Sequence, residues 1–321
     1  MYLPKVLLGL LLGFCLQGCN SDQENQGLVT IGINPWPGYE FLYLAEQKGF
    51  FKQVGANIKL VQLASLTDAQ ETYIEGHTDG MTSTLTEVVQ APFLGGKPLN
   101  VVLVTDYSNG GDVIIASKDI PDLTSLKGKT VGCEVSSLGI FILQRALKTV
   151  GLTLSDVTVV NVEQLDGVAA ITSQAVDALV AYPPESVKVL NHPQFHTVFT
   201  SAEIPREIVD TLSISEVVLQ QQPELVAKIH KAWQLALDFS LQYPEEANTI
   251  MASREGISVA EFEQTLQGVA IQDSSAQQVF FSDPSQLQQT ATGVCETMVY
   301  VNSLDIDCAR LPNLIYRGKT R

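Results

Sequence analysis

The sequence predicts an α/β protein made of two lobes, each a mostly parallel sheet flanked by helices. Short apolar segments rich in β-branched residues alternate with helical patterns along residues 28–185, and this alternation is typical of βαβ units and parallel sheets. A polar stretch with two adjacent glycines, residues 106–112, separates two apolar strands and indicates a crossing between lobes. The chain is also long enough for two lobes of ordinary domain size.

The first residues are predicted to be a lipoprotein signal peptide, residues 1–18. Lys5 precedes an apolar run over residues 6–16 that is too short to span a membrane, and Gly18-Cys19 follows in an ending that resembles a bacterial lipobox. We therefore expect Cys19 to carry a lipid anchor and residues 19–27 to form a polar tether. The alternative, a buried N-terminal helix, would have to hide apolar surface on every side. Asn20 leaves the choice between inner and outer membrane open.

The charge of the chain excludes one class of partner. The formal net charge is −16, and loss of the signal peptide with its single lysine makes it −17. Nucleic acid is excluded because its phosphates need a basic face. A strongly anionic ligand is disfavoured as well, although local geometry can override net charge.

The cysteines predict neither a metal site nor a catalytic thiol. The sequence has no C-x-x-C and no zinc-ligand spacing, so we expect no metal and no cofactor. Cys133 lies in a predicted strand and is interpreted as a small core residue. Cys295 and Cys308 are the candidate disulfide pair in an oxidising envelope compartment.

The first lobe opens with a strand at residues 28–33 and a rigid aromatic loop. Prolines on both sides of Trp36 fix the backbone, and Gly38 allows it to approach a neighbouring group. A helix follows over residues 40–48. Because ligands of open α/β sheets lie beyond the carboxyl ends of strands, Trp36 and Tyr39 are predicted to overhang a pocket. The alternative is that both are ordinary packing residues.

Hydroxyl groups follow the next strands of this lobe. Ser65 begins a helix that runs through residue 74, and Thr84 lies within a hydroxyl-rich segment at residues 81–86. Both could bind a ligand at the strand ends, since helix N-termini offer free N–H groups. The alternative is that both only cap their helices. A strand at residues 99–105 then leads into the first crossing.

The second lobe repeats this chemistry. Ser136 and Ser137 begin a long helix directly after a strand at residues 130–134, and Tyr182 stands beside two prolines at the end of another strand. A lysine-glycine motif at residues 127–130 lacks the first glycine of a phosphate-binding loop and is rejected. With a second crossing near residues 203–210, lobe 1 comprises residues 28–106 and 210–321, and lobe 2 comprises residues 107–209.

Several short motifs in one order resemble a known family. They are Pro35-Trp36, Gly49-Phe50-Phe51, Gly76 with Asp79, the 106–112 break, residues 125–129, Gly151-Leu152, Val176-Asp177-Ala178 and Tyr182-Pro183. In this order they resemble ABC-transporter substrate-binding proteins of the nitrate, sulfonate and taurine class, which includes binders of thiamine-related pyrimidines. The resemblance covers residues 28–251. It implies a type II periplasmic-binding fold whose lobes close over a small molecule by a hinge of two crossings.

The resemblance also implies a function and a site. The protein would be monomeric, reside in the periplasm on its lipid anchor, and deliver its ligand to an ABC permease and its ATPase. Matching positions place the ligand among nine residues, namely Trp36, Tyr39, Ser65, Thr84, Ser108, Asp112, Ser136, Ser137 and Tyr182. Asp106 and Asp112 would shape the hinge or take a cationic group.

The substrate class is narrowed by what these positions lack. None of them is an arginine or a lysine, the residues that commonly bind anions. Carboxylates and aromatic rings favour a neutral or cationic nitrogenous compound. Sulfonate stays open, because helix N-termini and hydroxyls alone can hold oxyanions.

Two rival functions remain open at this stage. A sensory binding protein that reports to a membrane receptor would have the same fold and pocket. An enzyme related to thiamine-pyrimidine synthesis would share the fold, but its cysteine-rich signature is absent from this sequence.

Overall fold

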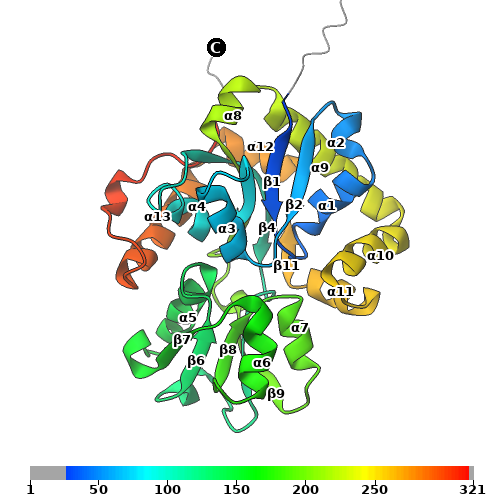
Figure 1. The fold of residues 1–321 in the computed structure, drawn as a ribbon. Helices are drawn as coiled ribbons and strands as arrows, with labels where there is room; N and C mark the ends of the chain where they lie inside the picture. The colour runs from blue at the N-terminus through cyan, green and yellow to red at the C-terminus, as the bar shows by residue number, and fades with distance from the viewer. Residues whose placement is uncertain (1–26, 318–321) are drawn as a thin grey trace, which may run out of the picture.

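The computed structural model describes residues 27–317, which form two halves, each built around one sheet (Figure 1). The predicted signal peptide, Cys19 and the tether up to residue 26 lie outside the described residues. Within residues 27–317, no helix combines the length and the apolar character needed to cross a bilayer. The predicted α/β class with two helix-flanked sheets is confirmed.

The six-stranded sheet has the order β11-β4-β10-β3-β1-β2. Its strands are β1 (Val29–Ile33), β2 (Ile58–Gln62), β3 (Gly80–Thr84), β4 (Leu99–Ser108), β10 (Val209–Ser215) and β11 (Val269–Ile271). β1 pairs in parallel with β2 and β3, whereas β10 is antiparallel to β3 and β4, and β11 is antiparallel to β4. Four of the five residues of β1 are buried, which explains its continuous apolar sequence.

The five-stranded sheet has the order β7-β6-β8-β5-β9. Its strands are β5 (Val113–Ser117), β6 (Thr130–Cys133), β7 (Thr158–Asn161), β8 (Ala178–Ala181) and β9 (Phe195–Thr200). β6 is parallel to β7 and β8, but β5 is antiparallel to β8 and β9. Both sheets are therefore mixed, which corrects the predicted mostly parallel pairing. Strands next to the crossings enter each half in the opposite direction, and hydrophobic periodicity carries no information on strand direction.

Helices cover both faces of each sheet (Figure 1). In the six-stranded half they are α1 (Glu40–Gln47), α2 (Phe50–Gln53), α3 (Leu66–Ile74), α4 (Leu85–Gln90), α8 (Glu216–Gln221), α9 (Leu225–Gln242), α10 (Pro244–Glu255), α11 (Val259–Leu266), α12 (Ser274–Ser282) and α13 (Ser285–Tyr300). In the five-stranded half they are α5 (Leu138–Thr149), α6 (Gly167–Thr172) and α7 (Glu185–Leu190). The apolar face of α9, which includes Ile229 and Trp233, is buried.

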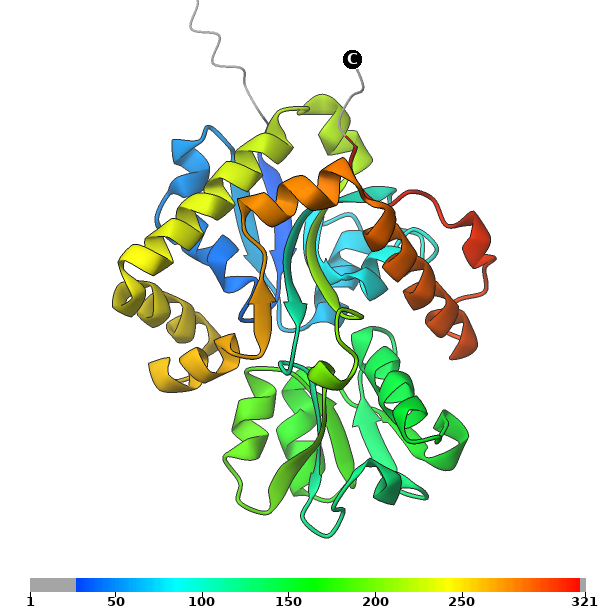
Figure 2. The same cartoon turned by 180° about the vertical axis from the view of Figure 1, so that it is seen from behind.

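Two segments carry the chain between the halves, residues 109–112 and residues 201–208, and they lie side by side (Figure 2). The backbone N–H of Ser108 donates to the carbonyl of Ile208 at 3.2 Å, and that of Ser201 donates to the carbonyl of Asp112 at 2.9 Å. β4 continues to Ser108, beyond the lobe boundary predicted after residue 106. The two crossing segments therefore form a short connection between the halves, and they are hydrogen-bonded to each other.

The C-terminal segment returns to the six-stranded sheet. A disulfide joins Cys295 in α13 to Cys308, with their Cα atoms 5.8 Å apart. Beyond it, Ile315 forms a parallel bridge with Val101 of β4, and the Val101 N–H donates to the carbonyl of Leu314 at 2.7 Å. The segment that ends the described chain is therefore held by the disulfide to α13 and by backbone hydrogen bonds to β4.

Candidate ligand-binding site

The loop after β1 places Trp36 at the junction of the two halves. Trp36 is 3% exposed, and its indole N–H donates to both carboxylate oxygens of Asp106 at 3.2 Å. A Cβ on Gly38 would lie 1.7 Å from Asp106 Oδ2, so only glycine permits this close approach. The rigid loop predicted from its prolines is thus closed by a buried carboxylate on β4.

Three aromatic rings meet at this junction. The ring of Trp36 lies 6.5 Å from that of Tyr39 and 6.2 Å from that of Tyr182, measured between centroids. Tyr182 comes from the five-stranded half, directly after β8. Two prolines follow it, and they are joined by a cis peptide bond. Trp36, Tyr39 and Tyr182, which the sequence predicts at one site, are therefore in contact across the two halves.

Three buried aspartates lie beneath these rings. Asp106 on β4 and Asp210 on β10 are direct neighbours across the strand pair, and Asp112 precedes β5. All are at most 2% exposed. The hydroxyl of Tyr39 donates to Asp210 at 2.6 Å. Among the described residues, both carboxylate oxygens of Asp112 and Oδ2 of Asp210 have no hydrogen-bond partner.

Burial strongly affects the protonation of these aspartates. Desolvation raises the pKa of Asp106 and of Asp112 to about 7, and the neighbouring negative charges add to the effect. Desolvation, followed by repulsion from Asp106 and Asp112, also raises the pKa of Asp210 well above its usual range. The site is therefore a buried acidic cluster, and none of its described lining residues is an arginine or a lysine. Such an arrangement strongly favours either protonation or a bound positive charge.

Hydrogen bonds join the halves around the cluster. The backbone N–H of Leu138, at the start of α5, donates to Glu87 of α4 at 2.9 Å. The backbone N–H of Leu66, at the start of α3, donates to the hydroxyl of Tyr182 at 3.1 Å. Thr67 donates to Glu134 at 3.1 Å, whose pKa burial raises to about 7. The two halves are thus closed on one another.

A small cavity remains inside this closed junction. Its volume is about 10 Å³, which is roughly the room for one water molecule. Eight residues line it, namely Asn34, Trp36, Tyr39, Leu66, Asp112, Leu138, Tyr182 and Asp210. Any larger ligand therefore requires the halves or these side chains to move apart.

The structure places the predicted hydroxyl residues around the cavity rather than in its lining. Ser65 accepts from the Asp68 N–H at 3.1 Å and caps α3. Thr84 forms a capping box with Glu87. The hydroxyl of Ser108 accepts from the backbone N–H of Asp112 at 3.2 Å and lies 2.7 Å from the hydroxyl of Ser201.

The two predicted serines of the five-stranded half also lie outside that lining. The hydroxyl of Ser137 is buried and accepts from Thr67 at 3.3 Å. Ser136 is exposed, and its hydroxyl lies 3.4 Å from that of Thr67. Contact of any of these hydroxyls with a ligand stays a prediction.

Sequence reasoning missed four residues of the lining. Asn34 and Asp210 supply polar groups, while Leu66 and Leu138 supply the first residues of α3 and α5. Asp210 carried a usable signal, because it is the one charged residue of a strand whose other polar residues are hydroxyls, and a carboxylate is rarely buried without a partner. Leu66 and Leu138 directly follow the predicted Ser65 and Ser137, so the sequence located both helix starts but not the residues that line this cavity.

Metal ligands and reactive thiols are the other two groups at issue in this sequence. In residues 27–317, no group of three histidine, cysteine, aspartate or glutamate side chains is arranged to hold a metal ion. Among the same residues, Cys133 is the cysteine outside the disulfide, and burial raises the pKa of its thiol to about 12. A thiol with this pKa is a poor nucleophile.

Two sheets of this topology, joined by paired crossings over a buried junction, define the periplasmic-binding-protein fold. The chain belongs to the family described as NMT1/THI5 like, whose model matches residues 36–247. The family resemblance predicted from the sequence motifs is thereby confirmed.

Two curated relatives illustrate this family. The formylaminopyrimidine-binding protein of Halalkalibacterium halodurans is 23% identical over 259 residues, 78% of each chain. The 4-amino-5-hydroxymethyl-2-methylpyrimidine phosphate synthase of Aspergillus parasiticus is 25% identical over 230 residues, which are 66% of this chain and 65% of the synthase.

The chain spans less than two thirds of the length of some relatives. A Haemophilus influenzae protein named for thiamine biosynthesis, for example, is matched over 46% of its length.

Solved structures share the fold. The alkanesulfonate-binding protein SsuA from Xanthomonas axonopodis pv. citri, bound to MOPS, has a TM-score of 0.75 at 17% identity, covering 91% of this chain and 98% of its own. The nitrate-binding protein NrtA from Synechocystis PCC 6803 has a TM-score of 0.63 at 13% identity, covering 89% and 91%. The desulfurization enzyme DSZB has a TM-score of 0.61 at 15% identity, covering 88% and 94%. The fold is therefore common to binding proteins and to at least one enzyme.

Proposed function

We propose that this protein is the solute-binding component of an ABC importer and captures a small cationic nitrogenous compound between its two halves. Lobe 1 is the six-stranded half, residues 28–108 and from 209 onward, and lobe 2 is the five-stranded half between the two crossings. The family and the fold support capture by closure, as do the hydrogen bonds between the halves. The mature protein is held at a bacterial membrane, on the periplasmic side, by lipid on Cys19 and meets a permease with its ATPase.

The observation that carries the substrate class is the buried acidic cluster under aromatic rings. Unpaired carboxylates away from water are strongly unfavourable, yet Asp112 and Asp210 retain buried oxygens that have no hydrogen-bond partner among the described residues. A ligand with N–H donors and a positive charge supplies both missing interactions. The faces of Trp36, Tyr39 and Tyr182 stabilise such a cation further through cation–π contact.

An aminopyrimidine fits these requirements. It is planar, it carries an exocyclic N–H₂ group, and a ring nitrogen can take up a proton. The names of two relatives, a formylaminopyrimidine-binding protein and a hydroxymethylpyrimidine phosphate synthase, point to the same chemical class. A sulfonate or nitrate is less well matched, because no arginine or lysine belongs to the cavity lining in the described chain and the aspartates would repel the anion.

Transport without turnover is favoured over catalysis. The similarity to a synthase and to a desulfurization enzyme keeps enzymatic activity as the second candidate. Against it stands the buried thiol of Cys133, which lies outside the cavity lining and has a pKa far above neutral. Incubation of the protein with each bound compound, followed by mass spectrometry, separates the two candidates: unchanged compound supports transport, and a product supports catalysis.

The experiment that tests the proposed function is a thermal-shift screen of the soluble form, residues 20–321. Formylaminopyrimidine, 4-aminopyrimidine and simple alkylamines are compared with taurine, alkanesulfonates and nitrate. A ligand that binds only the folded state raises the midpoint of unfolding by mass action. We expect a nitrogenous cation to give the largest shift, and a larger shift with a sulfonate or nitrate would overturn the substrate class.

A further inference from the structure

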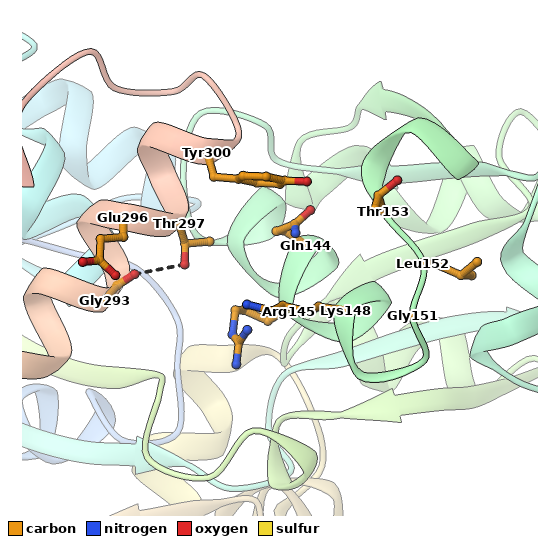
Figure 3. A pocket seen from close by; sticks show the side chains of 10 residues that line it. All are labelled: Gln144, Arg145, Lys148, Gly151, Leu152, Thr153, Gly293, Glu296, Thr297 and Tyr300. Atoms are coloured by element: carbon orange, nitrogen blue, oxygen red, sulfur yellow. Dashed lines mark hydrogen bonds between the residues drawn. The ribbon is translucent and has the colours of Figure 1, made fainter.

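A second cavity lies between α5 of the five-stranded half and α13 of the six-stranded half (Figure 3). Its volume is about 470 Å³, within the range of roughly 300–1,000 Å³ that is typical of small-molecule sites. None of its lining residues belongs to the cavity between the aspartates. The two cavities are therefore separate. The second cavity is open to solvent, whereas the first is enclosed between the halves.

An unsatisfied acceptor lines this cavity. Gln144 of α5 is 6% exposed, and its side-chain carbonyl oxygen accepts no hydrogen bond within the described residues. Figure 3 shows Gln144 and Tyr300, which comes from the end of α13, in the lining of the same cavity. A buried amide oxygen strongly favours a donor partner. A bound molecule with an N–H or O–H group would supply it.

The opposite wall carries a glycine that packing does not explain. Gly293 lies in the interior of α13, where glycine disfavours the helix relative to alanine. A Cβ built on Gly293 would meet no atom within 4 Å, so no neighbour forbids a side chain. The missing side chain keeps this wall of the cavity open.

The charged residues of the lining indicate the charge of the ligand. Arg145 is already paired with a carboxylate, since its guanidinium donates to Glu207 at 2.6 Å. Lys148, in the last turn of α5, is exposed and has no ion-pair partner in the described part of the chain. Glu296 on α13 also belongs to the lining and would repel a second anionic group. One carboxylate directed at Lys148 is therefore the charge that fits.

We propose that the cavity between α5 and α13 is a second binding site for an aromatic carboxylate that bears an N–H or O–H donor. The carboxylate pairs with Lys148, the donor bonds the free oxygen of Gln144, and the ring lies against Tyr300. None of these contacts involves a residue that lines the cavity between the aspartates.

Calorimetric titration of the purified protein with four probes tests this site. The probes are 4-hydroxybenzoate and 4-aminobenzoate, which carry both groups, benzoate, which lacks the donor, and phenol, which lacks the carboxylate. A neutral hydrogen bond changes affinity by about threefold to tenfold. We expect both substituted benzoates to bind about threefold to tenfold more tightly than benzoate, and phenol to bind least.

Three variants assign that binding to the cavity. Gln144→Met should remove the preference for 4-hydroxybenzoate while leaving benzoate unchanged. Gly293→Leu should abolish binding of all probes by filling the cavity. Lys148→Gln should weaken the benzoates, and Lys118→Gln, at an exposed lysine elsewhere, should not.

The cleft variant Asp112→Asn should leave all four affinities unchanged, and this separates the site from the proposed transport site. Four results would overturn the proposal: no heat at millimolar probe, equal affinity for benzoate and 4-hydroxybenzoate, binding that survives Gly293→Leu, or loss of binding in Asp112→Asn.

Discussion

The rings of Trp36 and Tyr182 meet edge to face, with their planes at 80° and their centroids 6.2 Å apart. Trp36 follows β1 of the six-stranded sheet, and Tyr182 follows β8 of the five-stranded sheet. A contact of this kind adds about 0.5–1.5 kcal/mol beyond the burial of the rings. It also means that any ligand lying between the two rings must separate them, so ligand entry and opening of the halves are one process.

Replacement of Trp36 should abolish ligand binding. Trp36→Ala removes an aromatic wall and the donor to Asp106, and it leaves that carboxylate without its indole partner. We expect the thermal shift given by the best ligand to disappear. Trp36→Phe keeps a ring and should retain part of the shift. A full shift in Trp36→Ala would show that Trp36 does not contact the ligand.

Stability without ligand should fall as the pH rises. The pKa of Asp106 and of Asp112 is raised from 3.8 to about 7, so the folded state binds more protons than the unfolded state between these values. The free energy of unfolding must then decrease across this window and level off above it. We expect a higher midpoint at about pH 5 than at about pH 8.

The variant Asp112→Asn provides the matched control for this pH effect. An amide cannot ionise, so the variant should lose part of the pH dependence and be more stable than the wild type at about pH 8. Asp305→Asn, at an exposed position, should behave as the wild type. Stability that rises between these two pH values in the ligand-free wild type is incompatible with the buried acidic cluster.

The disulfide should stabilise the C-terminal segment. Cys295 and Cys308 close a short loop with a sequence separation of 13, for which the chain-entropy model gives about 3 kcal/mol. We expect the double replacement Cys295→Ser with Cys308→Ser to lower the free energy of unfolding by about 2–4 kcal/mol. Denaturant titration measures this, and the wild type under strong reductant should match the variant. An unchanged midpoint would show that the bridge contributes nothing.

Glu87 should help to hold the halves closed. Its carboxylate bonds Thr84 of its own half and the N–H of Leu138 at the start of α5. Glu87→Ala removes both bonds, and loss of the helix cap alone typically lowers stability by about 1 kcal/mol. We expect a larger radius of gyration by small-angle X-ray scattering in the ligand-free variant. Glu71→Ala, at an exposed position of α3, is the control, and equal radii for the two variants would exclude this role.

The sequence was sufficient for those features that depend on local chemistry. The prolines around Trp36 and after Tyr182 predicted a rigid loop in each half from local chemistry alone. The glycines before Asp112 marked the first crossing.

Other features depend on contacts that no local pattern carries. Ser65 and Thr84 look alike as ligand donors and as helix caps, and only the positions of Asp68 and Glu87 show that both are caps. Asp210 lies in a strand of mixed apolar and polar residues, and its place beside Asp106 depends on the antiparallel pairing of β10 with β4. Strand direction has no signature in periodicity, so that pairing and the mixed sheets could not be foreseen.

Calorimetric titration of the best nitrogenous cation into the wild type, Asp112→Asn and Asp305→Asn tests the central claim most directly. A hydrogen bond to a charged group is worth about 1.5–3 kcal/mol, so we expect Asp112→Asn to bind roughly ten- to a hundredfold more weakly, and Asp305→Asn to bind like the wild type. Because a cation lowers the raised pKa values of the aspartates, binding near neutral pH should also release protons. Equal affinity in all three proteins, or tighter binding of an anion in Asp112→Asn with no cation bound by the wild type, would contradict the account.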